Sequence, residues 1–252
     1  MDNVINPILI IAAVDHELSH LVGEIRNPVH SMIGKRKTVS GNLFGSPVLV
    51  LTTGPGMINT AQALTAVLEH VAPFLIIQTG CAGIFKESGG DLGDIGLAQN
   101  DIDVQSGIEA EEGSPFIPEP LPFFLLESKS GSIRNNYPVD PHLADNAFLI
   151  LKDAFKSSGT RVLRGPFITV STITATDSRA AAYHGSYFPI MESMEGAAAA
   201  HVALHYNIPF LEIRAASNRV GKRDKQSWDL SLSFRQCTLA VNQLIKHINQ
   251  LR

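Results

Sequence analysis

Two glutamates stand where apolar, strand-like runs give way to helix-like segments, and a carboxylate at such a place can orient water or bind sugar hydroxyls. Glu17 follows the run Pro7–Val14 and is either a solvated residue of a first helical turn or a buried general base. Glu195 precedes an alanine-rich segment. It is either a helix-start carboxylate favoured by the helix dipole or the acceptor for two adjacent hydroxyls, as on a ribose. Met194 beside it would then pack against the sugar.

An amide side chain and a glycine-rich strand end are the other candidates for a role in chemistry. Asn218 follows the apolar run Ile208–Ala215. Its side chain is a turn or cap group or, because it carries both a donor and an acceptor, a partner for two neighbouring atoms of a base edge. Residues 80–83, Gly-Cys-Ala-Gly, let backbone N–H groups approach a ligand, although a tight turn accounts for them equally well. No histidine or lysine stands beside Cys81, which favours a packing residue over a nucleophile.

Patterns that would hold a metal or a nucleotide cofactor are weak. His201 and His205 have the i,i+4 spacing of a metal pair, but no third ligand stands near them, so helix-surface histidines are the better interpretation. Neither G-x-G-x-x-G nor G-x-x-x-x-G-K-[ST] occurs. We therefore expect no metal and no cofactor.

Strand-like and helix-like segments that could position these residues alternate along the chain. The expected strands are Pro7–Val14, Lys37–Phe44, Pro47–Thr53, Phe74–Thr79, Ile95–Val104, Arg161–Thr172, 189–193 and Ile208–Ala215. The expected helices are Glu17–Ile25, Met57–His70, 140–157, Asp177–Tyr183, Gly196–Tyr206 and Leu230–Leu251. This order predicts an α/β fold over 1–252, one domain with a central mixed β-sheet flanked by helices. In such sheets ligands bind at the carboxyl ends of strands, where the residues above would converge.

Composition excludes several classes of partner. The chain has 252 residues, 44% of them hydrophobic, with a formal net charge of −4, which gives no long-range attraction to nucleic acid or anionic lipid. The apolar run Ile8–Val14 has about seven residues against the roughly 20 needed to cross a bilayer. Two cysteines cannot form a disulfide framework. We expect a cytoplasmic protein with a small-molecule partner.

The order of the motifs resembles the nucleoside phosphorylase and nucleosidase superfamily. The resemblance rests on IIAAVDHELSHL, TTGPGMINTAQAL, QTGCAG, ESMEGAAAAHVA and IRAASN, in chain order. It covers most of the chain, and MEGAA with a later R-x-x-S-[DN] is its most specific part. The resemblance implies the fold of that superfamily and a nucleoside substrate.

Within the superfamily the sequence is most similar to the futalosine hydrolases, through VSTITATDSRAA, ESMEGAAAA and SNRVGKRDKQSWDL. Relatives that cleave methylthioadenosine and S-adenosylhomocysteine usually carry an acidic residue where this chain has Asn218. Adenine presents an N6 donor beside N7, which suits an aspartate, whereas hypoxanthine presents the O6 acceptor, which suits the NH₂ group of an asparagine. The resemblance implies hydrolysis of the N-glycosidic bond of futalosine to hypoxanthine and dehypoxanthine futalosine, in menaquinone biosynthesis.

The resemblance also implies site residues. Glu17 and Asn218 would be catalytic, one positioning water and the other binding the base as charge develops. The expected substrate-binding residues are Cys81, Ala82, Gly83, Ile173, Thr174, Met194 and Glu195. No arginine stands near Asp15 or Gln78, which favours hydrolysis over phosphorolysis. A methylthioadenosine/S-adenosylhomocysteine nucleosidase and a non-catalytic nucleoside-binding protein of the same fold stay open as alternatives.

Relatives of this kind are commonly homodimers whose partner chain contributes to the pocket, so we expect a homodimer. The segment 86–122, rich in Gly, Asp, Glu and Pro, is expected to be a long excursion around the site or an oligomer contact, with an exposed loop as the alternative. The candidates for binding a distal carboxylate of the substrate are Arg134, Arg219, Lys222 and Arg223.

Overall fold

A computed structural model of the chain describes residues 6–111, 116–129 and 131–251. In these residues ten strands form one mixed sheet, and its main path runs in the order β11-β10-β6-β12-β5-β1-β4-β3-β2, with β9 paired to β6. The strands of this path are β11 (Met191–Ser193), β10 (Val162–Thr169), β6 (Ile95–Asp103), β12 (Phe210–Arg219), β5 (Leu75–Ile84), β1 (Ile8–Ala12), β4 (Ser46–Thr52), β3 (Arg36–Leu43) and β2 (Arg26–Ile33). The expected α/β class with a mixed sheet is confirmed.

The parallel strands at the centre of the sheet are continuous apolar runs. All five residues of β1 are buried, and β1 lies between β4 and β5, parallel to both. Strand β5 also pairs in parallel with β12. Strands covered on both faces need apolar residues at every position, because neither side meets water. The carboxyl ends of these four strands therefore lie at one edge, as the site requires.

At the other end of the path the sheet closes on itself. Strand β11 pairs with β10 in parallel and with β5 in the antiparallel sense, and β12 pairs with β6 in the antiparallel sense. Strands β5, β12, β6, β10 and β11 thus form a ring, which the order of elements in the sequence did not predict. Closure brings the end of β11, with Glu195 just beyond it, across from the end of β5.

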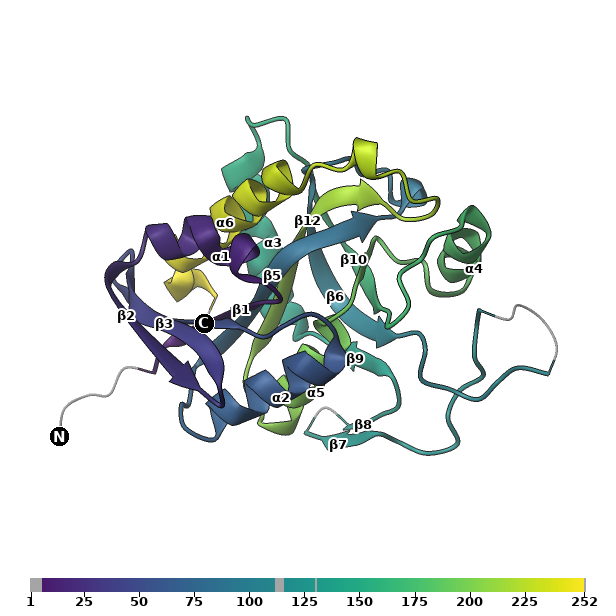
Figure 1. The fold of residues 1–252 in the computed structure, drawn as a ribbon, viewed down its shortest axis with the longest axis horizontal. Coiled ribbons are helices and arrows are strands. Elements are labelled where there is room, and N and C mark those ends of the chain that lie inside the picture. The colour runs from purple at the N-terminus through teal and green to yellow at the C-terminus, as the bar shows by residue number, and fades with distance from the viewer. Residues whose placement is uncertain (1–5, 112–115, 130, 252) are drawn as a thin grey trace.

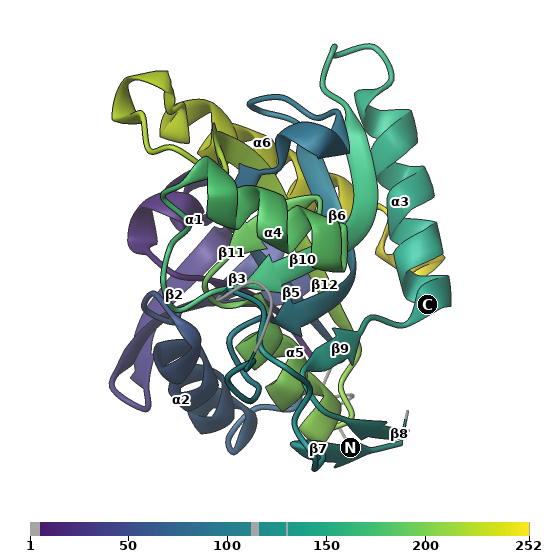
Figure 2. The same ribbon diagram turned by 90° about the vertical axis from the view of Figure 1, so that its right-hand side faces the viewer.

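Helices cover the sheet in two layers (Figures 1 and 2). On one face lie α1 (Asp15–Gly23), α3 (Pro141–Phe155) and α6 (Leu230–Lys246). On the opposite face α2 (Met57–Leu68) packs beside α5 (Gly196–His205). Helix α4 (Asp177–Tyr187) lies at the edge of the ring and contributes the buried side chain of Tyr183. No helix in the described part of the chain is long and apolar enough to cross a membrane.

Several expected elements differ from the structure. Within the segment 86–122, the expected strand Ile95–Val104 is confirmed as β6, and it lies inside the sheet, not in an excursion from it. The remainder of that segment stays a predicted excursion or oligomer contact, and positions 112–115 lie outside the described residues. The long closing helix ends at Lys246 and is followed by a short 3₁₀ turn, Ile248–Gln250. Strand β2 was not expected, because its residues are almost all exposed and it carries Pro28 at the sheet edge, where a missing N–H is tolerated. Three-residue strands β7 (Leu126–Ser128), β8 (Gly131–Ile133) and β9 (Asn136–Pro138) are too short to give a periodic signal.

Candidate active site

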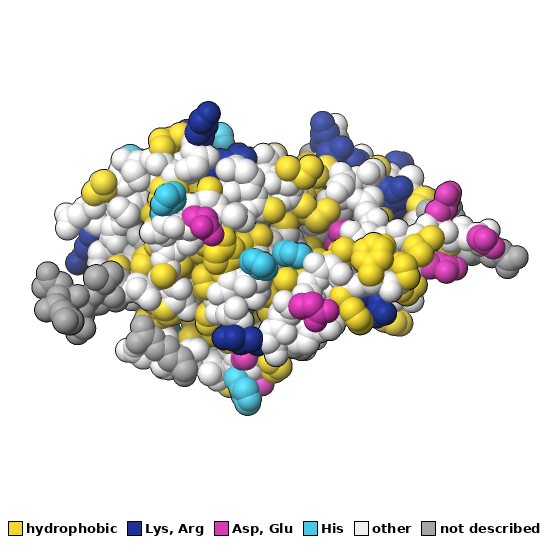
Figure 3. Space-filling model, turned by 90° about the horizontal axis from the view of Figure 1, so that it is seen from below, with side chains coloured by type: hydrophobic (Ala, Val, Ile, Leu, Met, Phe, Trp, Pro, Cys, Tyr) yellow, Lys and Arg dark blue, Asp and Glu magenta, His cyan; other side chains and the backbone are white. Residues whose placement is uncertain are grey.

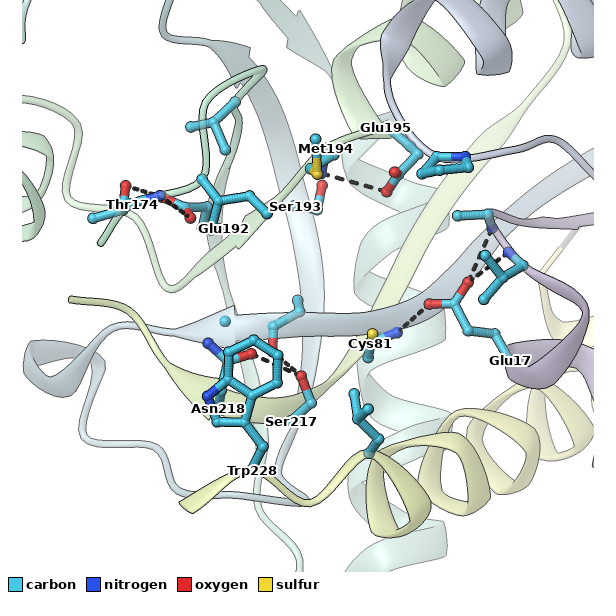
Figure 4. A pocket seen from close by; sticks show the side chains of 18 of the residues that line it. Glu17, Cys81, Thr174, Glu192, Ser193, Met194, Glu195, Ser217, Asn218 and Trp228 are labelled. Atoms are coloured by element: carbon cyan, nitrogen blue, oxygen red, sulfur yellow. Dashed lines mark hydrogen bonds between the residues drawn. The ribbon is translucent and has the colours of Figure 1, made fainter. Parts of the chain in front are cut away.

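One pocket gathers the residues that the sequence singled out for catalysis and for binding the sugar and the base (Figure 4). Its cavity has a volume of about 260 Å³, and Glu17 and Asn218 both line it. It is also lined by Cys81, Ala82, Gly83, Ile173, Thr174, Met194 and Glu195. Of the candidates for binding a distal carboxylate, Arg223 lines this pocket, whereas Arg134, Arg219 and Lys222 do not. The convergence of strand ends is therefore as expected, while the role of each residue stays a prediction.

Glu17 is a buried carboxylate held by the main chain. Its side chain is 3% exposed, so it is not the solvated helix residue of the first alternative. Oε2 accepts hydrogen bonds from the N–H groups of Ala13 at 3.0 Å and Val14 at 3.1 Å, at the start of α1. Oε1 accepts from the N–H of Cys81 at 2.9 Å, at the end of β5. Three backbone donors from two strand ends thus fix the position of this carboxylate.

Gly80 explains how the Glu17 carboxylate reaches β5. A Cβ atom at position 80 would lie 2.5 Å from Oε1 of Glu17, and the residue has a φ of +135°. Glycine meets both demands, since it has no Cβ and adopts positive φ readily. The glycine of the 80–83 motif therefore makes room for a carboxylate, in addition to turning the chain.

Glu195 is the second buried carboxylate of the pocket, at 4% exposure. Its Oε1 accepts from the N–H of Gly56 at 2.9 Å, and Gly56 has a φ of +87° that favours glycine. Its Oε2 accepts from Nη2 of Arg214 at 3.2 Å and from the N–H of Met194 at 3.4 Å. The Gly54-Pro55-Gly56 turn before α2 is thereby tied to the start of α5.

Arg214 is the cation that holds Glu195 from behind. It is 1% exposed, and its Nε donates to Oε1 of Glu212 at 2.9 Å. Burial acts to lower the pKa of Arg214, but the surrounding carboxylates, Glu212, Glu195 and Glu17, raise it above the ordinary value. The guanidinium therefore stays charged and is committed to its carboxylate partners.

The opposite end of the pocket is built from side chains that bind one another. The half-buried amide of Asn218 accepts from the hydroxyl of Ser217 at 2.9 Å and donates to the carbonyl of Arg219 at 3.1 Å. Trp228 lines the same pocket, and in the view of Figure 4 its indole overlaps Asn218. The guanidinium of Arg223 lies over that indole, 5.1 Å from the ring centroid. This end thus presents an amide, an aromatic ring and a cation.

Thr174 and Glu192 form a pair at the same end. The N–H of Thr174 donates to Oε1 of Glu192 at 3.1 Å, and its hydroxyl donates to Oε2. Burial raises the pKa of Glu192 above its ordinary value, and the two bonds from Thr174 offset part of that rise. The N–H of Thr174 is thus bonded to Glu192 and is not free to donate to a substrate, whereas Ile173 beside it is 43% exposed.

Cys81 and the histidine pair have the surroundings of packing residues. Burial and the nearby carboxylate of Glu17 raise the pKa of the Cys81 thiol, which disfavours the thiolate that a nucleophile requires. His201 packs edge-on against Tyr137, with 5.4 Å between ring centroids. In the part of the chain that the structure describes, no group of three or more His, Cys, Asp or Glu side chains could hold a metal ion.

Sequence reasoning missed several residues of the pocket, above all Glu192 and Trp228. Glu192 lies in the middle of the apolar segment 189–194, where a lone acidic residue flanked by buried neighbours is a usable signal. The sequence around Trp228 and Arg223 fits a charged loop with one aromatic anchor as well as a loop that closes over a substrate. Their contact with the pocket depends on the path of the chain after β12, which local sequence does not determine.

Comparison with known proteins gives matches along nearly the whole chain. The family model described as the Phosphorylase superfamily matches residues 7–250. A curated relative from Bacillus licheniformis, named 5'-methylthioadenosine/S-adenosylhomocysteine nucleosidase, is 28% identical over 96% of this chain and 99% of its own length. A relative of the same name from Listeria innocua is 29% identical over 95% of this chain and 98% of its own length.

Solved structures agree at the level of the fold. The nucleosidase of that name from Neisseria meningitidis, solved in complex with methylthio-immucillin-A, superimposes with a TM-score of 0.81 at 20% identity and covers 96% of this chain and 99% of its own. The fold thus agrees over nearly the whole length of both chains. The chain belongs to the phosphorylase superfamily.

Proposed function

We propose that this protein is a nucleosidase, which hydrolyses the N-glycosidic bond of a purine ribonucleoside. The observation that carries the proposal is the pair of buried carboxylates, Glu17 and Glu195, fixed by main-chain donors at one end of a single pocket. Cleavage of an N-glycosidic bond passes through a sugar cation resembling the oxocarbenium ion of glycoside hydrolysis. Two fixed negative charges beside that sugar would stabilise it.

Each pocket residue has a role in this reaction. Glu17 orients a water molecule toward the anomeric carbon and takes its proton. Glu195 accepts hydrogen bonds from the ribose hydroxyls, with Met194 against the ring, and Cys81, Ala82 and Gly83 line the same side. Asn218 binds the base as negative charge moves onto it. Ile173 and Thr174 form the part of the pocket wall that borders the base.

Water is a better nucleophile for this pocket than phosphate. Among the pocket-lining residues, all of them in the described part of the chain, the arginine is Arg223, which lies by Trp228 at the base end. Arg214 lies behind the wall and is bonded to Glu195 and Glu212. A phosphate dianion next to Glu17 would meet a carboxylate without a free cation to offset the repulsion.

The names of the relatives favour methylthioadenosine or S-adenosylhomocysteine as substrate. These names do not support futalosine hydrolysis, which the sequence motifs suggested. They support the alternative, a methylthioadenosine/S-adenosylhomocysteine nucleosidase. We therefore propose an adenine nucleoside with a 5'-thioether arm as the first candidate for the substrate.

One observation favours a second candidate, a 6-oxopurine nucleoside such as futalosine. The residue at the base end is an amide, Asn218, whose NH₂ group can donate to O6 while its carbonyl accepts from a protonated N7. An aspartate at this position would instead suit the amino group of adenine. The two candidate substrates therefore differ in how their base would bind the side chain at position 218, and an assay with both nucleosides can separate them.

The test is an assay of four substrates by one protein. The purified enzyme is incubated with methylthioadenosine, S-adenosylhomocysteine, inosine and futalosine, with and without phosphate, and the released base and sugar are identified by chromatography. We expect a free base and a free sugar, independent of phosphate. Formation of a sugar phosphate would overturn hydrolysis, and no base from any substrate would favour a nucleoside-binding protein.

We also propose that the chain forms a homodimer through the face that carries α2 and α5. Figure 3 shows apolar side chains gathered on this face. Ile58 on α2 is 88% exposed and lines one hollow together with Met57, Ala198 and Val202 of the two helices, and a contiguous exposed apolar patch marks an interaction site. Sedimentation of the wild type and of Ile58→Asp tests this: the variant should sediment as a monomer, and a monomeric wild type would contradict the proposal.

A further inference from the structure

A second pair of carboxyl groups lies behind the wall of the pocket. Asp101 on β6 and Glu212 on β12 are both completely buried, and neither lines the pocket. One oxygen of each is well bonded: Thr169 donates to Oδ1 of Asp101 at 2.6 Å, and Arg214 donates to Oε1 of Glu212 at 2.9 Å. The other oxygens, Oδ2 and Oε2, have no hydrogen-bond partner among the described residues.

These two unpartnered oxygens face one another beneath Gly196. A Cβ atom at Gly196 would lie 2.1 Å from Oδ2 of Asp101 and 2.2 Å from Oε2 of Glu212. The two oxygens are therefore no farther apart than the sum of these distances. Two ionised carboxylates at such a separation repel, and each leaves a buried lone pair unsatisfied. One proton between them removes both penalties.

We propose that Asp101 and Glu212 share one proton, and that the pair acts as a positioning device for Glu195 through Arg214. The proton leaves Glu212 and Glu195 as the two carboxylates bonded to the guanidinium. A third negative charge on Asp101 would draw Arg214 inward and weaken its bond to Glu195. The positioning role rests on the proposed function, in which Glu195 holds the ribose hydroxyls.

The groups packed around the pair are consistent with a proton held there. Burial, with the charge of Glu212 second, raises the pKa of Asp101 well above its ordinary value of 3.8. From β9, Tyr137 faces the same space with a pKa raised to about 12, chiefly by burial, and so stays neutral. From α5, the N–H of Ala197 donates to the hydroxyl of Thr169, which leaves that hydroxyl's proton for Asp101. Arg214 is the cation that faces the pair, with Glu195 and Glu17 beyond it.

Two variants distinguish the effect of the shared proton from the effect of the negative charge that is bonded to Arg214. Asp101→Asn is isosteric and its NH₂ group supplies a permanent donor to Glu212, whereas Glu212→Gln removes a negative partner of Arg214. Asp103→Asn is the matched control, since Asp103 lies on the same strand, is 7% exposed and bonds Gln105 and Ser106 instead. All variants are first compared with the wild type by circular dichroism and thermal unfolding.

The kinetic readout is the preference for a ribonucleoside over its 2'-deoxy counterpart, taken as the ratio of kcat/KM. The carboxylate of Glu212 fixes Nε of Arg214, and without it the guanidinium loses the orientation in which Nη2 bonds Glu195. Because Glu195 would bind the 2'-hydroxyl, Glu212→Gln should therefore reduce this ratio about tenfold, the loss expected for one weakened hydrogen bond to a charged group. Asp101→Asn and Asp103→Asn should keep it within about twofold, since neither alters the charge bonded to Arg214. A purely structural role for Glu212 would lower kcat/KM for both substrates by one factor, and that result would overturn the positioning role.

The proton itself is tested without any substrate. The infrared difference spectrum of wild type minus Asp101→Asn at neutral pH should contain the carbonyl stretch of a protonated carboxyl group, shifted in D₂O. Absence of that band would overturn the shared proton, whether or not the protein is active. A band in a protein that cleaves no nucleoside would leave the proton in place and reject the proposed function instead.

Discussion

The two ends of the pocket are built by different means. At the sugar end, Glu17 and Glu195 each accept three hydrogen bonds, and five of the six donors are main-chain N–H groups, with Arg214 the sixth. At the base end, three of the four donors are side chains, the hydroxyls of Ser217 and Thr174 and the amide of Asn218, and the fourth is the N–H of Thr174. Main-chain donors are fixed by the sheet, whereas side-chain pairs can be exchanged one residue at a time.

This difference suggests how one fold can keep its sugar chemistry while changing the base that it accepts. The carboxylates at the sugar end are tied to three strand ends and the α2 turn, so a change there disturbs the frame. A change at Asn218 alters an amide that is half-buried beside a loop. We expect mutations at the sugar end to affect turnover for every substrate, and mutations at the base end to affect the choice among substrates.

The strongest test of the sugar end is Glu17→Gln. Loss of a general base lowers turnover about 10²–10⁴-fold, and because the amide keeps the size of the side chain, the fold should be retained. Steady-state kinetics on the best substrate measures kcat, and Glu24→Gln, at the opposite end of α1 and outside the pocket, serves as the control. Turnover near that of the wild type would remove Glu17 from the mechanism.

A second test concerns how stability depends on pH. The pKa of Asp101 is raised in the folded protein above its ordinary value of 3.8, so the native state keeps a proton that the unfolded chain releases. The stabilisation from this group is complete below that ordinary value and is lost as pH rises toward the raised value, by up to about 1.4 kcal/mol per pH unit.

Asp101→Asn has no such proton to keep. Its free energy of unfolding, measured by urea titration at several pH values between acid and neutral, should therefore rise relative to that of the wild type as pH increases. The comparison at one pH removes effects shared by both proteins. Parallel pH profiles for the two would contradict a raised pKa at Asp101.

The frame of the sugar end can be broken at Gly196. A methyl group there would meet Asp101 and Glu212 well inside contact distance, so Gly196→Ala should destabilise the fold by about 1–3 kcal/mol, the usual cost of overpacking. Gly185→Ala is the matched control, because a Cβ there meets nothing within 4 Å. Thermal unfolding measures the stability of both variants. Equal unfolding midpoints would show that the side chains of Asp101 and Glu212 move aside for the methyl group at little cost.

The smallest expected effect lies at the base end. Asn218→Asp should shift the preference between adenine and hypoxanthine nucleosides toward adenine by about tenfold, the weight of one hydrogen bond gained or lost at the base edge. Competition assays with methylthioadenosine and futalosine measure this ratio, while kcat on the better substrate reports the sugar end. An unchanged ratio would place base recognition elsewhere, with Glu192 as the next residue to mutate.

Much of the frame could be predicted from the sequence alone. Continuous apolar runs such as β1 and β5 indicate buried parallel strands, and polar residues at their ends indicate the edge of the sheet where ligands bind. Glu17, Glu195 and Asn218 stand at such ends and do line one pocket. Short or exposed elements escaped, because β2 and β9 lack an apolar period.

What the sequence could not determine depends on contacts between distant segments. The closure of the ring through β11 and β5, and the meeting of Asp101 with Glu212 under Gly196, require the register of strands far apart in the chain. An acidic residue inside an apolar strand is unusual, but its sequence neighbours do not show which other charge it meets. Local sequence thus determined which residues stand at the strand ends, and tertiary packing decided which charges were buried together, because burial and pairing of charges depend on neighbours that only the folded sheet supplies.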